Sequence, residues 1–169
     1  MAQHVAAALC VHDFRGIKTH RHDSPLSEEV CAVAERVHLP VLYDPMGEID
    51  RVRWAVKRFP SVTFVVPHLG SFDDEWLAQR GIIELMQRHD NLMSDSSGIR
   101  CFDLLQEAIQ RVGTSRILFG SDGPYLHPAM ELDKIRLLKL APEDEARVLW
   151  INAMRVFGNL QSGVRDGQS

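Results

Sequence analysis

The sequence has 169 residues and a mass of 19.1 kDa, which is the size of one ordinary domain. Apolar residues make up 45% and charged residues 25% of it, which argues against a disordered chain, a collagen and a disulfide-rich small protein. The 19 basic and 23 acidic residues leave a formal charge of -4 and form no basic run, so we expect no nucleic-acid partner.

The cysteines and the apolar runs indicate the cellular compartment. The sequence has an odd number of cysteines, Cys10, Cys31 and Cys101, and no CxxC motif. This argues against a disulfide framework and a zinc ribbon. No apolar stretch approaches the roughly 18 residues that span a bilayer, and the N-terminus lacks a signal-type apolar region. We therefore expect a cytoplasmic protein that is not associated with a membrane.

Short apolar or β-branched runs alternate with helical patterns along the chain. The opening residues, up to Asp13, have a helical pattern without a polar lead-in, and we expect that the true start of the protein lies upstream. Five runs then predict strands. These strands cover residues 14–19, 40–43, 62–66, 91–94 and 116–119.

Helical patterns with their own start and stop signals follow each predicted strand. They cover residues 24–38, 48–58, 73–89 and 101–112, and then two helices in 130–157 that are divided near Pro142. In the third of these helices, the spacing predicts a buried face made by Trp76, Leu77, Ile82, Ile83, Leu85 and Met86. Residues 161–169 are rich in Gly, Ser, Gln and Asp and predict a flexible tail.

Alternating strands and helices with short links are typical of parallel βαβ units. Such units form either an open, doubly wound sheet or a closed barrel of eight units, which usually takes about 250 residues. Five units are too few to close a barrel. The sequence therefore predicts an α/β fold that is an open sheet or a partial TIM barrel, in one domain over residues 1–160.

Each predicted strand ends in histidine or aspartate. The residues are His20, Asp44, His68, Asp95 and Asp122. Because the carboxyl ends of parallel strands gather at one edge of the fold, these side chains are expected to converge there. Imidazole and carboxylate groups are ligands for zinc and manganese, and a bound ion lowers the pKa of its water. The pattern predicts metal-assisted hydrolysis of a small molecule.

Each of these residues also has a purely structural interpretation. His20 begins a polar segment with Arg21 and His22, so it is only a weak candidate for binding substrate. Asp44 precedes a proline as turn residues often do, and Asp95 precedes two serines, which is typical of a turn or cap. His68 and Asp122 follow buried apolar runs, where a polar group without a function would lack an evident partner.

Four strings resemble the amidohydrolase-related family of TIM-barrel metal hydrolases and decarboxylases. They are GIKTH at 16–20, PHLG at 67–70, FGSDGP at 119–124 and NAMRVFG at 152–158. The resemblance implies that the five units correspond to strands four to eight of the barrel. It also implies that His68 is the sixth-strand histidine and Asp122 the eighth-strand aspartate, both catalytic and both metal ligands.

The sequence departs from this family in two ways. Asp44 stands where the family has its fifth-strand histidine, and the first-strand His-x-His pair has no counterpart in this chain. Asp44 can still bind zinc or manganese, so the resemblance implies a site of Asp44, His68 and Asp122. A catalytic zinc commonly takes three protein ligands, so these three residues would all be needed.

The resemblance implies a metal-dependent hydrolase or decarboxylase that acts on a small acid, lactone or amide. The alternative is a non-catalytic remnant, or binding module, derived from that family. A phosphoacceptor signalling fold is disfavoured because that fold needs an acidic pair after its first strand, where this sequence has Thr19 and His20. An open partial barrel exposes strand edges and inner apolar surface, so we expect a homodimer or a second chain that supplies the missing units.

Overall fold

The protein is described here from a computed structural model, which covers residues 14–72 and 76–158. The helix predicted in residues 1–13 and the tail predicted at 161–169 lie outside the described residues. Within the described residues, strands and helices alternate as expected.

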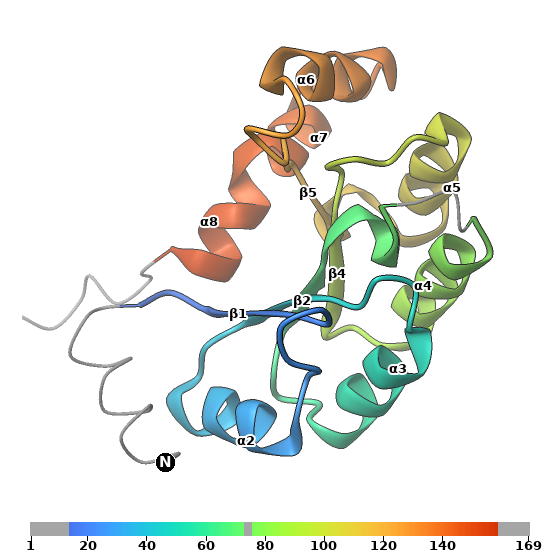
Figure 1. The fold of residues 1–169 in the computed structure, drawn as a ribbon. Coiled ribbons are helices and arrows are strands. Elements are labelled where there is room, and N and C mark those ends of the chain that lie inside the picture. Colours follow the sequence, from blue (N-terminus) through green and yellow to red (C-terminus); the bar gives the residue numbers. More distant parts are fainter. Residues whose placement is uncertain (1–13, 73–75, 159–169) are drawn as a thin grey trace, which may run out of the picture.

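Five strands form one parallel sheet in the order of the chain, β1-β2-β3-β4-β5 (Figure 1). They are β1 (Ile17–His20), β2 (Val41–Asp44), β3 (Phe64–Val66), β4 (Leu92–Asp95) and β5 (Ile117–Leu118). All five predicted strands are confirmed, although β5 is shorter than expected. The reason is that the N–H of Phe119 donates to the carbonyl oxygen of Val148 (2.8 Å) and not to a neighbouring strand.

Four helices cover one face of the sheet and bury the larger core against it (Figure 1). They are α2 (Glu28–Val37), α3 (Ile49–Arg58), α4 (Trp76–Arg88) and α5 (Phe102–Val112). The start of α2 follows the predicted chemistry, because the Ser27 hydroxyl accepts a hydrogen bond from the Val30 N–H (3.2 Å). From each central strand alternate residues, such as Val41, Phe64 and Leu92, enter this core.

The buried face predicted for the third helix is partly wrong. Ile82, Ile83, Leu85 and Met86 are buried, but Trp76 and Leu77 are 51% and 68% exposed. Trp76 lies one turn before Arg80, whose guanidinium carbon lies 5.4 Å from the centre of the indole ring. Residues four apart share one side of a helix, so Trp76 and Arg80 both face away from the core.

The opposite face of the sheet, which would be the inside of a barrel, carries a second apolar cluster. Val65, Met93 and Leu118 are at most 4% exposed, and the helix α8 (Asn152–Phe157) packs over them through residues that include Phe157. Phe157 also lies against Gly16, just before β1. The sequence predicts that this inner apolar surface is exposed. In the structure, α8 of the same chain covers most of it.

The last region divides near Pro142, as predicted. The helix α6 (Pro128–Leu137) is followed by a continuous run of α7 (Pro142–Ala146), a π-helical turn (Arg147–Ile151) and α8. The side-chain amide of Asn152, which is buried, donates to the carbonyl oxygens of Thr114 (2.8 Å) and Ile117 (2.7 Å). These bonds attach α8 to the start of β5. Among the described helices, none has both the length and the apolar character needed to cross a membrane.

The two bonds of Asn152 lead to a prediction for stability. Asn152→Ala leaves two buried carbonyl groups without their donor, so we expect the free energy of unfolding to fall by about 1–3 kcal/mol. Urea unfolding followed by circular dichroism measures this change. Met154→Ala is the control, because Met154 lies on the same helix but is 58% exposed, and its effect should stay within about 0.5 kcal/mol. An unchanged unfolding midpoint for Asn152→Ala would contradict the prediction.

Candidate functional site

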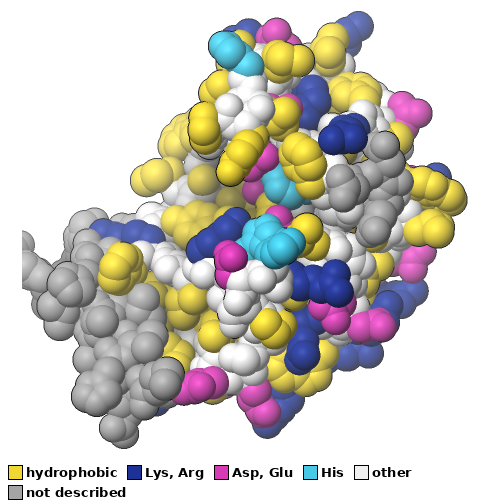
Figure 2. All heavy atoms as spheres, viewed as in Figure 1, with side chains coloured by type: hydrophobic (Ala, Val, Ile, Leu, Met, Phe, Trp, Pro, Cys, Tyr) yellow, Lys and Arg dark blue, Asp and Glu magenta, His cyan; other side chains and the backbone are white. Residues whose placement is uncertain are grey.

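The sequence-predicted residues come together at the carboxyl ends of the strands. His20, Asp44, His68 and Asp122 all line one cavity of about 730 Å³, together with Lys18 and Arg100. Figure 2 shows histidine side chains beside a hollow on this face of the molecule. The cavity is thus lined by side chains from all five βα units, and the sequence-predicted residues among them come from four.

A second cavity, of about 640 Å³, contains none of these residues. It lies at the amino ends of the strands and is lined in part by Arg116 and Arg155. The Arg116 guanidinium is already hydrogen-bonded to the carbonyl oxygens of His89 and Leu92 and to Asp90. The titratable groups that could perform chemistry therefore converge at the carboxyl end, as expected for parallel α/β folds.

His68 lies in a turn with unusual backbone geometry. The turn, Pro67–Gly70, follows β3, and its positive φ angles are 57° at His68, 51° at Leu69 and 89° at Gly70. A Cβ on Gly70 would lie 2.6 Å from Ile82, so only glycine fits there. Asp122 also has a positive φ, of 50°. Such strain in non-glycine residues costs about 1–3 kcal/mol each and is found most often at functional sites.

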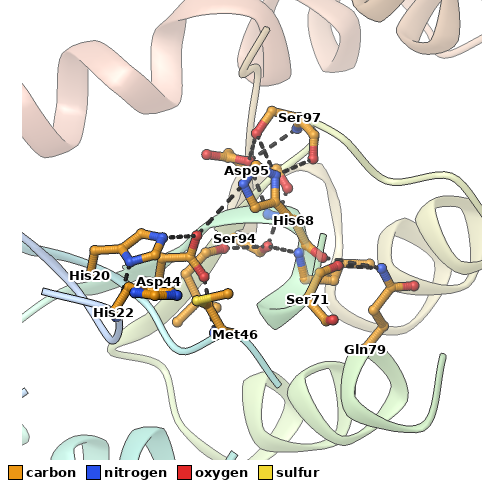
Figure 3. Close-up of polar contacts among 12 residues, drawn as sticks. His20, His22, Asp44, Met46, His68, Ser71, Gln79, Ser94, Asp95 and Ser97 are labelled. Carbon is orange, nitrogen blue, oxygen red and sulfur yellow. Dashed lines mark hydrogen bonds and ion pairs between the residues drawn. The ribbon is translucent and has the colours of Figure 1, made fainter. Parts of the chain in front are cut away.

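Neighbouring side chains hold this turn in place (Figure 3). The Ser94 hydroxyl accepts from the Leu69 N–H (3.1 Å) and donates to the carbonyl oxygen of Val66 (2.6 Å). The Gln79 amide donates to the carbonyl oxygen of Ser71 (2.8 Å), and Asp95 Oδ1 accepts from the His68 N–H (3.2 Å). Side chains from β4 and α4 therefore stabilise the conformation that presents His68 to the cavity.

The hydrogen bonds of His68 determine which ring nitrogen faces the cavity. Its Nδ1 lies 2.7 Å from the carbonyl oxygen of Ser97. A carbonyl oxygen can only accept, so Nδ1 carries the proton and donates it. In the neutral ring, Nε2 then holds the lone pair, and it lies 3.9 Å from Oδ2 of Asp44. His68 is 6% exposed, so the ring is held in this orientation inside the protein.

His20 has the opposite arrangement. Its Nδ1 accepts a hydrogen bond from the backbone N–H of His22 (3.1 Å), so the neutral ring carries its proton on Nε2. That nitrogen lies 3.4 Å from Oδ2 of Asp44 (Figure 3). His20 is therefore oriented as a hydrogen-bond donor toward the cavity, while His68 presents a lone pair to it.

Asp44 is the carboxylate that both histidines face. Its Oδ1 accepts from the backbone N–H of Met46 (3.0 Å), which fixes the orientation of the group and leaves Oδ2 toward the two rings. The side chain is buried, at 7% residue exposure. Hence the end of β2 places one carboxyl oxygen within 4 Å of both rings, 3.4 Å from His20 Nε2 and 3.9 Å from His68 Nε2.

Asp95 confirms the turn interpretation and has a further role. Its Oδ1 accepts from both the N–H (3.0 Å) and the hydroxyl (2.6 Å) of Ser97, two residues later, as a turn aspartate does. Desolvation raises the pKa of Asp95, while the hydrogen bonds from Ser97 and the nearby His68 oppose that rise. Asp95 thus holds Ser97 in the position from which the Ser97 carbonyl binds His68.

The chemistry of the donor set fits a divalent metal ion, although the full geometry of a site is not formed. Across residues 14–72 and 76–158, no three or more His, Cys, Asp or Glu side chains are arranged as a group that could hold a metal. The lone pair of His68 Nε2 and the Asp44 carboxylate nevertheless face each other over 3.9 Å, a gap that two metal bonds of about 2.1 Å can bridge. Two such acceptors repel unless a proton or a cation lies between them.

Several cavity residues were not predicted from the sequence. Lys18 could have been found, because it lies two residues before His20 and alternate residues of a strand share a face. Arg100, which lines the cavity, and Ser97, which binds the His68 ring, follow β4 in an irregular segment whose path no periodic pattern describes. The Arg100 guanidinium lies 5.3 Å from the ring of Phe72, which also lines the cavity.

Comparison with known proteins identifies the family. The sequence profile of the Amidohydrolase family matches residues 38–159, which is well over half of the chain. No protein of curated function matches the chain. The matched region contains Asp44, His68, Asp95 and Asp122, and it begins after His20.

Solved structures of similar fold include two decarboxylases and an amidohydrolase. One is 5-carboxyvanillate decarboxylase from Sphingomonas paucimobilis (20% identity, TM-score 0.67, 92% of this chain and 61% of that one). Another is dihydroxybenzoic acid decarboxylase from a Polaromonas species with bound manganese (16%, 0.65, 92% and 64%). The third is an amidohydrolase from Burkholderia multivorans with bound zinc (15%, 0.69, 85% and 64%).

These identities are low, so the likeness shows the fold alone. The chain spans 61–64% of the length of these three structures. Its five parallel βα units form a partial α/β fold that matches TIM-barrel amidohydrolases, as the sequence predicts. On the strength of the profile match, the chain belongs to the amidohydrolase family.

Proposed function

We propose that this chain carries the metal-binding edge of a metal-dependent hydrolase or decarboxylase that acts on a small acid, lactone or amide. One observation carries the proposal: the His68 lone pair and the Asp44 carboxylate face each other in a cavity that Asp122 also lines. The family match supports the general chemistry. The manganese and zinc bound in two structures of similar fold support a divalent ion as the cofactor.

Asp44, His68 and Asp122 would hold the ion. When bound, a zinc or manganese ion supplies Lewis acidity and a water of lowered pKa. The hydrogen bond from His68 Nδ1 to Ser97 fixes the ring in the tautomer that leaves Nε2 free to bind, as is usual for metal-binding histidines. Zinc is the first choice for this nitrogen and oxygen donor set, and manganese is the second.

The remaining steps concern this chain's own side chains. Asp122 would take a proton from the attacking water as general base, and His68 would be a second metal ligand or would stabilise charge on the substrate. His20 Nε2, which lies 3.4 Å from Asp44 Oδ2 in the structure, would instead donate its proton in a hydrogen bond to a substrate oxygen. Lys18, on the same face of β1 as His20, would attract an anionic substrate to the cavity.

The alternative is a binding module of the same family without turnover. One observation favours it: among the described residues, no three His, Cys, Asp or Glu side chains are already arranged to hold a metal ion. The two proposals differ in what they require of Asp122. A binding module needs it at most for holding a ligand, whereas an enzyme also needs it for moving a proton.

Metal binding gives the first test. Zinc or manganese is titrated into the metal-stripped full chain and followed by calorimetry. We expect one binding site in the unaltered chain. Asp44→Asn and His68→Ala should bind the metal at least about 100-fold more weakly, because loss of even a residue that only supports a metal ligand lowers metal affinity about 10–100-fold. His38→Asn is the control, since His38 lies at the other end of the sheet and asparagine tolerates its positive φ. Equal affinity in all four proteins would contradict the proposed ligands.

Turnover gives the second test. The metal-loaded full chain is assayed for release of carbon dioxide from 5-carboxyvanillate, the compound named for one similar structure, and for acid release from a small lactone. We expect Asp122→Asn to lower the rate by about 10²–10⁴-fold through loss of the general base. Asp133→Asn, on the exposed side of α6, should not change it. Metal binding without turnover of either probe would support the binding module.

We also propose that the chain associates with a second copy or with a chain that supplies further strands. Among the described strands, β1 pairs only with β2, and β5 only with β4, so each has one edge without a strand partner. Unpaired strand edges favour association. Size-exclusion chromatography with light scattering should therefore give a mass above 19.1 kDa. A stable monomer over a wide range of concentration would contradict this proposal.

A further inference from the structure

A buried ion pair on α6 contacts the loop that follows β4. Oε2 of Glu131 accepts from the backbone N–H of Gly98 (3.1 Å) and pairs with Nζ of Lys134 (2.6 Å). Nζ of Lys134 also donates to the carbonyl oxygen of Ile99 (3.1 Å). Glu131 is only 5% exposed. A buried charge pair is costly unless further hydrogen bonds satisfy it, and here those bonds go to the backbone of one loop.

That loop is the one that orients His68. Ser97, whose carbonyl oxygen binds Nδ1 of the ring, immediately precedes Gly98. Gly98 itself has a φ of 60°, and a Cβ on it would lie 3.0 Å from Nδ1 of His68 and 2.6 Å from the ring of Phe72. The backbone of the loop is therefore packed directly against the imidazole. A small displacement of Gly98 would move the Ser97 carbonyl away from Nδ1.

We propose that Glu131, together with Lys134, is a positioning residue for His68. Through Gly98 and Ser97 it holds the carbonyl oxygen that keeps the proton on Nδ1 and the lone pair on Nε2. The inference rests on the proposed function in one respect, namely that His68 is the residue whose orientation matters. It also explains why a carboxylate is buried on α6, the helix that follows the loop carrying Asp122.

A purely structural role for the ion pair would have a different consequence. Its removal would change stability but leave the His68 proton where it is. The tautomer of His68 therefore separates the two explanations. Nitrogen-15 spectra of the imidazole groups report it directly in the full chain, at about pH 8 where an ordinary histidine is neutral. His68→Gln identifies the signals of His68.

The main variant replaces both charged residues, Glu131→Met with Lys134→Met. Apolar side chains of similar volume often replace a buried ion pair without loss of stability, so this variant is expected to fold. We expect the signal of the Nδ1-protonated form, which dominates in the unaltered chain, to fall toward the mixture of an unconstrained ring. Glu131→Gln retains an acceptor for the Gly98 N–H and should restore the original tautomer.

The matched control is Asp133→Met with Arg136→Met. This pair has the same spacing on the same helix, but both side chains are more than 60% exposed. It should leave the His68 signals unchanged. Glu131→Ala is a second test of the same contact, and circular dichroism shows which variants are folded. Both Glu131→Ala and the double methionine variant remove the acceptor for the Gly98 N–H. If either variant folds and the His68 tautomer is unchanged, the proposal is overturned.

The readout needs neither metal nor substrate. If the chain binds no metal and turns over neither probe, the proposed function fails while the tautomer measurement still decides the role of Glu131. If metal binding is confirmed but the tautomer is insensitive to Glu131, only the positioning role fails.

Discussion

The chemistry of the cavity depends on the hydrogen bond between Nδ1 of His68 and the carbonyl oxygen of Ser97. Without it, the imidazole could carry its proton on either nitrogen, and Nε2 would not reliably face Asp44 as a lone pair. The bond joins residues from two neighbouring βα units, 29 positions apart in the chain. It therefore forms only when β3 and β4 are paired in their observed register. The pairing of β3 with β4 thus determines which ring nitrogen of His68 carries the proton.

The same contact accounts for the strained turn after β3. A positive φ at His68 and Leu69 is unfavourable by itself, but it directs the ring across to the next unit, where Ser94, Asp95 and Ser97 provide hydrogen bonds. Desolvation that raises the pKa of Asp95 is offset in part by those bonds. The hydrogen bonds from β4 and the segment after it thus offset both the backbone strain at His68 and Leu69 and the burial of the Asp95 carboxyl group.

The sequence predicted the strands and the strand-end residues because both follow from strong local patterns. Apolar runs identify buried parallel strands, and the geometry of such sheets brings their carboxyl ends together, which placed His20, Asp44, His68 and Asp122 at one cavity. The exposure of Trp76 was not predicted because its apolar character suggested burial, whereas Ala78 and Gln79 form the buried side of the first turn of α4. The position of α8 on the inner face depends on contacts with Val65, Met93 and Leu118, which are distant in the chain, and no local pattern encodes those contacts.

The contacts that orient the two histidines were not predicted, whether the partner is two positions away, as for His20, or 29 positions away, as for His68. His20 and His68 are the same residue type at equivalent strand ends, yet a backbone N–H from His22 makes one a donor, and a carbonyl from Ser97 leaves the other with a lone pair. Backbone groups in irregular loops make this distinction, and composition does not reveal them. A sequence can therefore locate a candidate functional edge by its residue types, while the hydrogen-bonding role of each histidine requires the path of the backbone around its ring.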